Sequence, residues 1–313
     1  LLTDEWCEFF AQNHFLVGIS IDGPQEYHDH YRRTSAGKPS WEKVMHGIHL
    51  LKKHRVEWNA MAVVNAYNAE HPLKFYHFFR DNGCQYLQFT PIVERLTEHE
   101  DGRTLASLAD VSHEDNYEDV GNAKKQKENQ EITIADFSVT SEQWGKFLCT
   151  IFDDWVRHDV GKIFVEIFDC TLANWVGVQP GICAYSKECG HAGVMEHNGD
   201  VFSCDHFVFP EYKLGNIQDK SLIDMLYGEK QQAFSRLKHT SLPRQCKECD
   251  MEFSCHGECP KNRFENDKYG EPGLNYLCKG YYEYYTHVAP YMDFMKRELQ
   301  AQRPPANIMN VLK

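Results

Sequence analysis

Strands and helices alternate in the hydrophobic pattern of the first third of the chain. Three apolar runs have the length of buried strands: 15–22, 56–65 and 86–93. Two stretches between them repeat apolar residues at helical spacing: 40–54 and 71–82. Ser40 is a suitable N-cap for the first helix, and Gly83 is a suitable stop for the second. This order predicts an α/β fold built from βαβ units, with parallel strands and right-handed crossovers.

Polar residues follow two of these predicted strands. Ser20 lies at the end of the first apolar run, and Asn65 lies at the end of the second. Ligands of parallel α/β folds bind at the carboxyl ends of the strands. We therefore expect Ser20, Asn65 and segment 88–93 to lie near a binding site.

The rest of the chain follows other patterns. Residues 98–136 are mostly polar and lack apolar periodicity, which predicts a surface loop or insertion, with a lid over the site as the alternative. Ser141 is expected to cap a helix over 142–157. The other expected elements are a short strand or extended run at 163–169, a hairpin at 194–207 with Asn198-Gly199 as a type I′ turn, helices at 222–228 and 231–238, and a closing helix at 280–299.

Eight of the 12 cysteines gather in one third of the chain. They are Cys183, Cys189, Cys204, Cys246, Cys249, Cys255, Cys259 and Cys278. The C-x2-C spacing of Cys246 and Cys249 lets two thiolates hold one ion or cluster from a tight turn. Two four-thiolate metal centres are favoured over four disulfides, which suit small secreted domains, because no signal peptide is seen. Zinc and iron–sulfur clusters both accept four thiolates, so the spacing leaves the metal open.

The composition narrows the classes of partner. The formal net charge is -13 and no long basic run occurs, which argues against binding to nucleic acid or to an anionic membrane. No apolar stretch reaches the length that spans a bilayer. The many free thiols predict a reducing compartment, and hence the cytoplasm.

Several of these motifs resemble one family. The run ISIDGP, followed by HDHYR, is similar to the central barrel of radical S-adenosylmethionine (SAM) enzymes. The eight-cysteine pattern resembles a SPASM domain, which carries two auxiliary 4Fe–4S clusters. The run CDHFVFPEYKLGNI together with C-x2-C-x5-C-x3-C is similar to anaerobic sulfatase-maturating enzymes. The resemblance implies a partial (β/α) radical SAM barrel, followed by a loop-rich SPASM domain. It also implies an oxidoreductase that converts an active-site Cys or Ser of a sulfatase to Cα-formylglycine.

The resemblance also implies roles for particular residues. The first auxiliary cluster would take Cys183, Cys189, Cys204 and Cys259, and the second would take Cys246, Cys249, Cys255 and Cys278. Both clusters would then be fully ligated by thiolates, which favours electron transfer, with a purely structural role as the alternative. Asp205 matches the family's catalytic base. Ser20, Arg32 and Val93 match contacts to SAM, Arg32 through the SAM carboxylate.

One part of the family pattern is missing. The C-x3-C-x2-C motif that binds the SAM-cleaving third cluster does not occur in the 313 residues. We therefore expect a fragment that is inactive alone. The expected division is 1–165 as the C-terminal part of the barrel with its acidic insertion at about 98–136, 166–280 as the SPASM domain, and 281–313 as a closing helix and tail.

The implied partners are a sulfatase polypeptide and a reductant such as flavodoxin or ferredoxin. Two alternatives stay open at this stage. One is another SPASM enzyme that modifies a different peptide. The other is a zinc-stapled module that binds a peptide without changing it, which would be colourless and would contain zinc in place of iron and sulfide.

Overall fold

The computed structural model describes residues 2–98, 104–106 and 133–312 of the 313-residue chain. Spatial proximity divides the chain into two compact units. The sheet unit comprises Leu1–Ile92, Val139–Gly181 and Leu277–Lys313, and the cysteine unit comprises Val93–Ser138 and Ile182–Tyr276. The sheet unit is thus assembled from three separate stretches of sequence. The domain ranges expected from the sequence stay a prediction.

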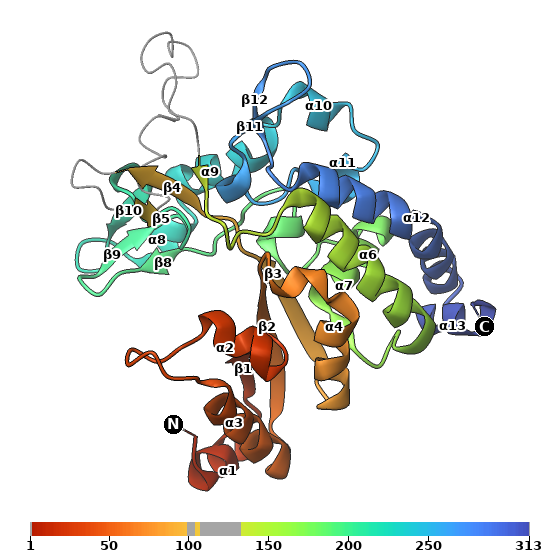
Figure 1. The fold of residues 1–313 in the computed structure, drawn as a ribbon. Coiled ribbons are helices and arrows are strands. Elements are labelled where there is room, and N and C mark those ends of the chain that lie inside the picture. The colour runs from red at the N-terminus through yellow and green to blue at the C-terminus, as the bar shows by residue number, and fades with distance from the viewer. Residues whose placement is uncertain (1, 99–103, 107–132, 313) are drawn as a thin grey trace. The chain divides into compact units, whose positions relative to one another are not determined.

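A parallel sheet forms the centre of the sheet unit (Figure 1). Its strands, in spatial order, are β1 (Leu16–Ser20), β2 (Glu57–Val64), β3 (Tyr86–Pro91) and β7 (Phe164–Val165). All three neighbouring pairs are parallel, and Ser20 is paired with Met61. The carboxyl ends of these strands therefore lie along one edge. The predicted α/β class and all three predicted strands are confirmed.

Helices pack on one face of this sheet, and the residues of β2 accordingly alternate between buried and more exposed positions. The helices of the sheet unit are α1 (Asp4–Gln12), α2 (Gln25–Tyr31), α3 (Trp41–Lys53), η1 (Asn68–Glu70), α4 (Pro72–Asp81), α6 (Ser141–His158), α7 (Glu166–Val176), α12 (Cys278–Gln300), η5 (Pro305–Asn307) and α13 (Ile308–Val311). Helices α6 and α12 pack closely because Gly145 and Gly280 meet where they cross. A Cβ atom at Gly280 would collide with the Ser141 carbonyl oxygen. No helix in the described ranges is long and apolar enough to span a bilayer.

Two helices begin where predicted but are capped by other residues. The Asp29 carboxylate accepts hydrogen bonds from the backbone N–H groups of Ser40 and Trp41 at the start of α3, at 2.8 and 2.9 Å. The Ser40 hydroxyl instead donates to the Arg32 carbonyl oxygen. Helix α6 begins at Ser141, but Thr140 is its cap. Ser40 therefore occupies the predicted N-cap position of α3, but the Asp29 carboxylate of α2 caps the helix in place of the Ser40 side chain. The predicted capping role of Ser141 was wrong, because Ser141 is the first residue of α6 and Thr140 caps it.

The predicted strand over 163–169 is mostly helix. Strand β7 has two residues, and α7 begins directly after it. Ile167, Phe168, Thr171 and Trp175 are all buried, and their spacing is that of one helical face. The short apolar run is therefore the first turn of an amphipathic helix, a case that period alone does not distinguish from a strand.

The cysteine unit consists of short elements. Its strands are β4 (Arg95–Glu98), β5 (Thr104–Ala106), β6 (Thr133–Ile134), β8 (Val194–Met195), β9 (Asp200–Phe202), β10 (Lys213–Asn216), β11 (Glu265–Asn266) and β12 (Pro272–Leu274). Its helices are η2 (Cys183–Tyr185), η3 (Pro210–Tyr212), α8 (Leu222–Leu226), α9 (Glu229–Thr240), α10 (Arg244–Lys247), α11 (Glu252–Cys255) and η4 (Pro260–Asn262). The strands form three small antiparallel sheets, with orders β5-β4-β6, β10-β9-β8 and β11-β12.

The structure corrects the predicted turn at 198–199 and describes only part of the predicted insertion at 98–136. The hairpin at 194–207 forms, but only Gly199 of its turn has a positive φ, of 86°. A type I′ turn needs a positive φ at both central residues, so the predicted turn type was wrong. Within 98–136, the described residues include β5 and β6. The remainder, and with it the lid alternative, lies outside the described residues.

Candidate metal centres and neighbouring polar groups

Helix α9 carries a buried polar stripe that holds the surrounding loops. Gln231, Ser235 and Lys238 lie on one helical face, and all three are at most 3% exposed. The Gln231 Nε2 donates to the carbonyl oxygens of Gly190 and Ser203, at 2.8 and 3.2 Å. The Ser235 hydroxyl accepts from the Gly190 N–H at 2.8 Å. These contacts therefore fix the two loops that carry the predicted ligands Cys189 and Cys204.

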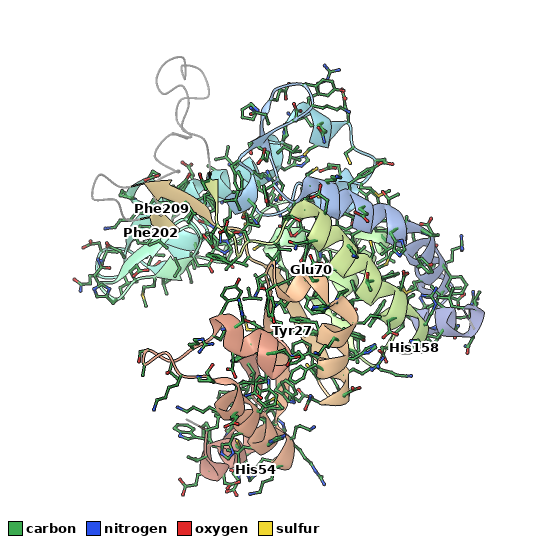
Figure 2. All side chains as sticks on the ribbon, viewed as in Figure 1. Tyr27, His54, Glu70, His158, Phe202 and Phe209 are labelled. Atoms are coloured by element: carbon green, nitrogen blue, oxygen red, sulfur yellow. The ribbon has the colours of Figure 1, made fainter. Side chains whose placement is uncertain are left out.

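An apolar wall lies beside those ligands. Phe207, Tyr212 and Phe234 form a buried aromatic cluster, and Cys189 and Cys204 pack against it. Phe209, which is labelled in Figure 2, also packs on this cluster. The two thiols thus share one apolar surface, although 14 residues lie between them in sequence.

His206 links two of the predicted ligands. Its backbone N–H donates to the Cys204 sulfur at 3.5 Å, and its Nδ1 lies 3.6 Å from the Cys259 sulfur. Burial raises the pKa of the Cys259 thiol to about 12, and the charge of Cys189 adds to this effect. Cys189 is in turn an electrostatic neighbour of Cys183. The four predicted ligands of the first centre therefore lie in one neighbourhood.

The second predicted set is divided between the two units. Cys246 lies in α10, and the Cys249 N–H donates to its carbonyl oxygen at 3.1 Å. Cys255 ends α11. Cys278 is the first residue of α12 and belongs to the sheet unit. Its ligation to the same centre stays a prediction.

The donor set fits metal centres. All 12 cysteines lie in the described ranges and none forms a disulfide. Burial raises the pKa of the thiols of Cys189, Cys204, Cys246 and Cys259, so they stay protonated until a metal supplies positive charge. Thiolates are the donors that iron–sulfur clusters and zinc prefer.

Asp205 projects from the edge of the first thiol set. The Cys204 thiol donates to its Oδ1 at 3.2 Å, and the side chain is exposed. Ligand atoms of Cys204, Asp205 and His206 lie within 4.8 Å of one another, which is close enough to hold one cation. Since Cys204 is itself a predicted cluster ligand, we do not regard this trio as a separate cation site. The carboxylate is thus accessible beside a dry thiol site.

Polar groups also gather at the carboxyl edge of the parallel sheet. Ser20 is exposed at the end of β1. The Arg32 Nε donates to the Asp22 carboxylate at 2.5 Å, and the other oxygen of that carboxylate accepts from the Val63 N–H at 2.8 Å. Asp22 is 3% exposed, so this buried carboxylate orients the arginine. The sequence places Asp22 with Ser20 at the polar end of the first predicted strand, but it does not indicate that Asp22 pairs with Arg32.

Two other predicted positions have evident structural roles. Asn65 is buried, and its Oδ1 accepts from the N–H groups of Tyr67 and Asn68, both at 3.0 Å. It therefore shapes the turn after β2. Val93 is 3% exposed and belongs to the cysteine unit, whereas Ser20 and Arg32 belong to the sheet unit. A shared SAM site for Ser20, Arg32 and Val93 stays a prediction.

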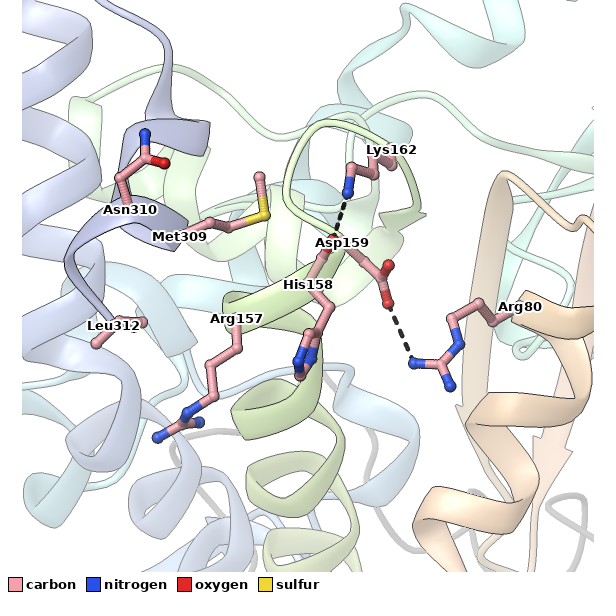
Figure 3. A pocket seen from close by; sticks show the side chains of 8 residues that line it. All are labelled: Arg80, Arg157, His158, Asp159, Lys162, Met309, Asn310 and Leu312. Carbon is pink, nitrogen blue, oxygen red and sulfur yellow. Dashed lines mark hydrogen bonds and ion pairs between the residues drawn. The ribbon is translucent and has the colours of Figure 1, made fainter.

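One pocket of the sheet unit lies apart from these groups (Figure 3). It has a volume of about 630 Å³ and is lined by Arg80, Arg157, His158, Asp159, Lys162, Met309, Asn310 and Leu312. Arg80 and Lys162 precede β3 and β7, so they mark the amino ends of the strands. Arg80 pairs with Asp154 at 3.0 Å and with Asp159 at 3.8 Å. Since its lining contains no thiol and lies at the amino ends of the strands, this pocket is not the candidate site.

Comparison with known proteins gives consistent matches. Residues 187–250 match the SPASM family, described as an iron–sulfur cluster-binding domain. A serine-type anaerobic sulfatase-maturating enzyme of Bacteroides thetaiotaomicron is 64% identical over 313 residues, which is 100% of this chain and 71% of that protein. A cysteine-type anaerobic sulfatase-maturating enzyme of Clostridium perfringens is 28% identical over 292 residues, which is 93% of this chain and 70% of that protein.

Solved structures give the same picture. Native anSMEcpe with bound AdoMet (SAM) has a TM-score of 0.75 and 27% identity, over 95% of this chain and 72% of that one. The same protein with bound AdoMet and the Kp18Cys peptide has a TM-score of 0.75 and 26% identity, over 95% and 73%. These similarities extend over both units of the chain.

Proposed function

The chain belongs to the family of anaerobic sulfatase-maturating enzymes, and we propose that it acts on serine-type sulfatases. It is a radical SAM oxidoreductase with an iron–sulfur-binding SPASM domain. The proposal follows the 64% identical relative, which is a serine-type enzyme, because the serine-type enzyme of Klebsiella aerogenes and the cysteine-type enzyme of Clostridium perfringens are about equally distant, at 27% and 28% identity. The preferred substrate residue is therefore a serine of the sulfatase, which the enzyme converts to Cα-formylglycine.

The proposal for the site rests on one observation. Four cysteines gather around α9, with Asp205 beside them: Cys183, Cys189, Cys204 and Cys259. These four cysteines hold the first auxiliary 4Fe–4S cluster. The second is held by Cys246, Cys249, Cys255 and Cys278. A third cluster, which binds SAM, takes its ligands from a C-x3-C-x2-C segment that these 313 residues do not contain. The chain spans 71% of the length of its 64% identical relative.

The chemistry assigns a task to Asp205. Oxidation of a serine side chain to an aldehyde removes two protons and two electrons. One proton and one electron leave Cβ together as a hydrogen atom, the other proton leaves the hydroxyl, and the other electron needs an acceptor. When bound, SAM and the iron–sulfur clusters supply the hydrogen-abstracting radical and the electron acceptor. Asp205 accepts the hydroxyl proton, and its exposed carboxylate can reach a peptide.

The other predicted contacts complete the site. Arg32, oriented by Asp22, pairs with the carboxylate of SAM, since a guanidinium held by one carboxylate keeps further donors. Ser20 donates to a polar oxygen of SAM, and Val93 contacts its adenine. A sulfatase polypeptide is the substrate, and a flavodoxin or ferredoxin is the reductant. The solved relative with a bound peptide supports a peptide substrate.

Metal analysis followed by a peptide assay tests this function. The protein, purified and reconstituted without oxygen, is expected to hold about eight iron and eight sulfide ions per chain, four of each per cluster. Zinc without sulfide would favour the peptide-binding module. The enzyme completed with a C-x3-C-x2-C segment should oxidise a serine-containing sulfatase peptide faster than its cysteine counterpart. Modification of an unrelated peptide instead would favour another SPASM enzyme.

A further inference from the structure

Lys238 is a buried cation whose hydrogen-bond partners among the described residues are backbone carbonyl oxygens. It is 1% exposed, and its Nζ donates to the carbonyl oxygens of Cys183, Ala184 and Ser186. These three acceptors use all three donors of the ammonium group. The contact also closes the η2 turn, in which the first predicted ligand lies.

Arg263 is a second such cation. Its Nε donates to the Gly257 carbonyl oxygen at 2.8 Å, and its Nη1 donates to that of Lys238 at 2.5 Å. Its Nη2 donates to the carbonyl oxygens of His256 and Glu258, both at 2.8 Å. The guanidinium is therefore fixed in place by four carbonyls, which carry no net charge.

The described residues do not balance this positive charge. Neither Lys238 nor Arg263 forms an ion pair with a carboxylate in the described ranges. The buried Glu258 is an electrostatic neighbour of Lys238, but its carboxylate accepts from the Cys259 N–H at 2.7 Å. No ion pair in the described ranges therefore neutralises either cation directly. Burying an unpaired charge is strongly unfavourable, so a further anion is expected nearby.

Thiols are the groups that surround these cations. Lys238 has the thiols of Cys189 and Cys259 as electrostatic neighbours. Arg263 has both of these and, from the second predicted set, Cys246 and Cys255. When such thiols become thiolates around iron, each four-thiolate 4Fe–4S cluster carries a net charge of about −2. The clusters would thus place negative charge close to both cations.

We propose that Arg263 and Lys238 are positioning residues that raise the reduction potentials of the auxiliary clusters. This inference rests on the proposed function. A cluster that takes up one electron becomes one charge unit more negative and takes up no proton. A fixed cation nearby stabilises that reduced state more than the oxidised state. Arg263 acts on both clusters, whereas Lys238 acts on the cluster of Cys189 and Cys259.

Redox titration of the reconstituted protein, followed by electron paramagnetic resonance, tests the proposal. Lys238→Met is expected to lower the reduced-to-oxidised ratio of the first cluster about tenfold at a fixed solution potential, which is ~59 mV for one electron. Arg263→Gln is expected to lower this ratio for both clusters. The matched control is Arg236→Gln, which removes an exposed positive charge from the same helix and should leave both ratios unchanged.

Iron and sulfide are measured first, so that only fully loaded proteins are compared. Arg263→Lys keeps the charge and should keep both potentials, which separates charge from loss of the carbonyl contacts. If Arg263→Gln binds less iron than the parent, the potential of fully loaded Lys238→Met tests the proposal in its place. An unchanged potential in loaded Lys238→Met, or an equal shift in Arg236→Gln, would overturn the proposal. A protein that binds both clusters but oxidises no sulfatase peptide would instead contradict the proposed function.

Discussion

At the scale of single residues, three consecutive side chains concentrate the chemistry. Cys204 packs on an aromatic wall, Asp205 accepts from its thiol and is exposed, and His206 reaches the Cys259 sulfur. A ligand, a base and a link to a distant thiol thus follow one another along the chain. The chain turns directly after β9, with the Phe207 N–H donating to the Cys204 carbonyl oxygen at 3.1 Å, and this turn leaves Asp205 exposed.

Asp205→Asn tests the proposed base. The amide keeps the size of the side chain but cannot accept the substrate proton, so peptide oxidation should fall by about 10²–10⁴-fold. Iron content should stay at the parental value. The assay is aldehyde formation measured by mass spectrometry, in an enzyme that also contains the C-x3-C-x2-C segment. Asp219→Asn, an exposed carboxylate of the same unit, is the control; parental turnover of Asp205→Asn would exclude it as the base.

Cys204→Ala tests the ligand assignment. Loss of one thiolate should remove about four irons per chain and should loosen the cysteine unit, because metal binding is coupled to folding. Iron analysis and limited proteolysis measure the two effects. Cys149→Ala removes a thiol of α6 outside both predicted sets and should keep the full iron content. Equal iron in both variants would contradict the assignment of Cys204.

At the scale of elements, helix α9 organises the cysteine unit through polar contacts. Its buried face consists of residues 231, 234, 235 and 238, at helical spacing. Three of these four are polar, and each contacts the backbone of a cysteine-bearing loop. The helix therefore acts as a template for loops that have little regular structure of their own.

Gln231→Leu tests this role of α9. The substitution leaves the Gly190 and Ser203 carbonyl oxygens without their buried donor, so the free energy of unfolding should fall by roughly 1–3 kcal/mol. Urea denaturation of the loaded protein measures this loss. Gln232→Leu, an exposed neighbour on the same helix, should have little effect. Similar losses in the two variants would show that the buried contacts are not what holds the loops.

Helix α7 carries a carboxyl group that should make stability depend on pH. Burial raises the pKa of the Asp169 carboxyl to about 7. An unfolded Asp titrates near pH 4, so between about pH 4 and 7 the unfolded chain loses a proton that the folded chain keeps. Folding stability should therefore fall as the pH rises through this range.

Asp169→Asn should remove that dependence, because the amide is neutral at every pH. The melting temperature of the variant should exceed that of the parent by a few degrees at pH 8 and should match it near pH 4. Thermal melts at the two pH values measure the difference. Asp153→Asn, a half-exposed carboxylate of α6, is the control. If the melting temperature of Asp169→Asn changed between pH 4 and pH 8 by as much as that of the parent, Asp169 would not be the group that titrates.

At the scale of the whole molecule, chemistry is divided between two units that interleave along the chain. The sheet unit supplies the edge with Ser20, Asp22 and Arg32, and it also contains Cys278. The cysteine unit supplies the other seven clustered cysteines and Asp205. Each group of candidate site residues is therefore assembled from stretches that are far apart in the sequence.

The 313-residue chain by itself should not cleave SAM. Reductive cleavage in this family needs the cluster of the C-x3-C-x2-C motif, which is not present in these residues. After reduction with dithionite, chromatography should find no 5′-deoxyadenosine. Addition of the corresponding segment of the 64% identical relative by fusion should restore the product. Formation of 5′-deoxyadenosine by the chain alone would disprove this prediction.

The sequence by itself determined the features that depend on local pattern. The periods of 56–65 and 142–157 specify a buried strand and an amphipathic helix, because the side chains that repeat belong to one element. The cysteine spacing likewise identified the thiol-rich domain and the family. The prediction of a strand from the short apolar run 163–169 was mostly wrong, because a short strand and the first turn of a helix have the same apolar pattern.

Only the tertiary structure decided which distant groups meet. The Asp29 carboxylate caps α3, Asp22 orients Arg32, and Lys238 and Arg263 lie among the thiols. No local period indicates such contacts, because each joins residues from different elements. Buried charges and caps are satisfied by whichever partner the packing brings near, and the packing is a property of the folded chain as a whole.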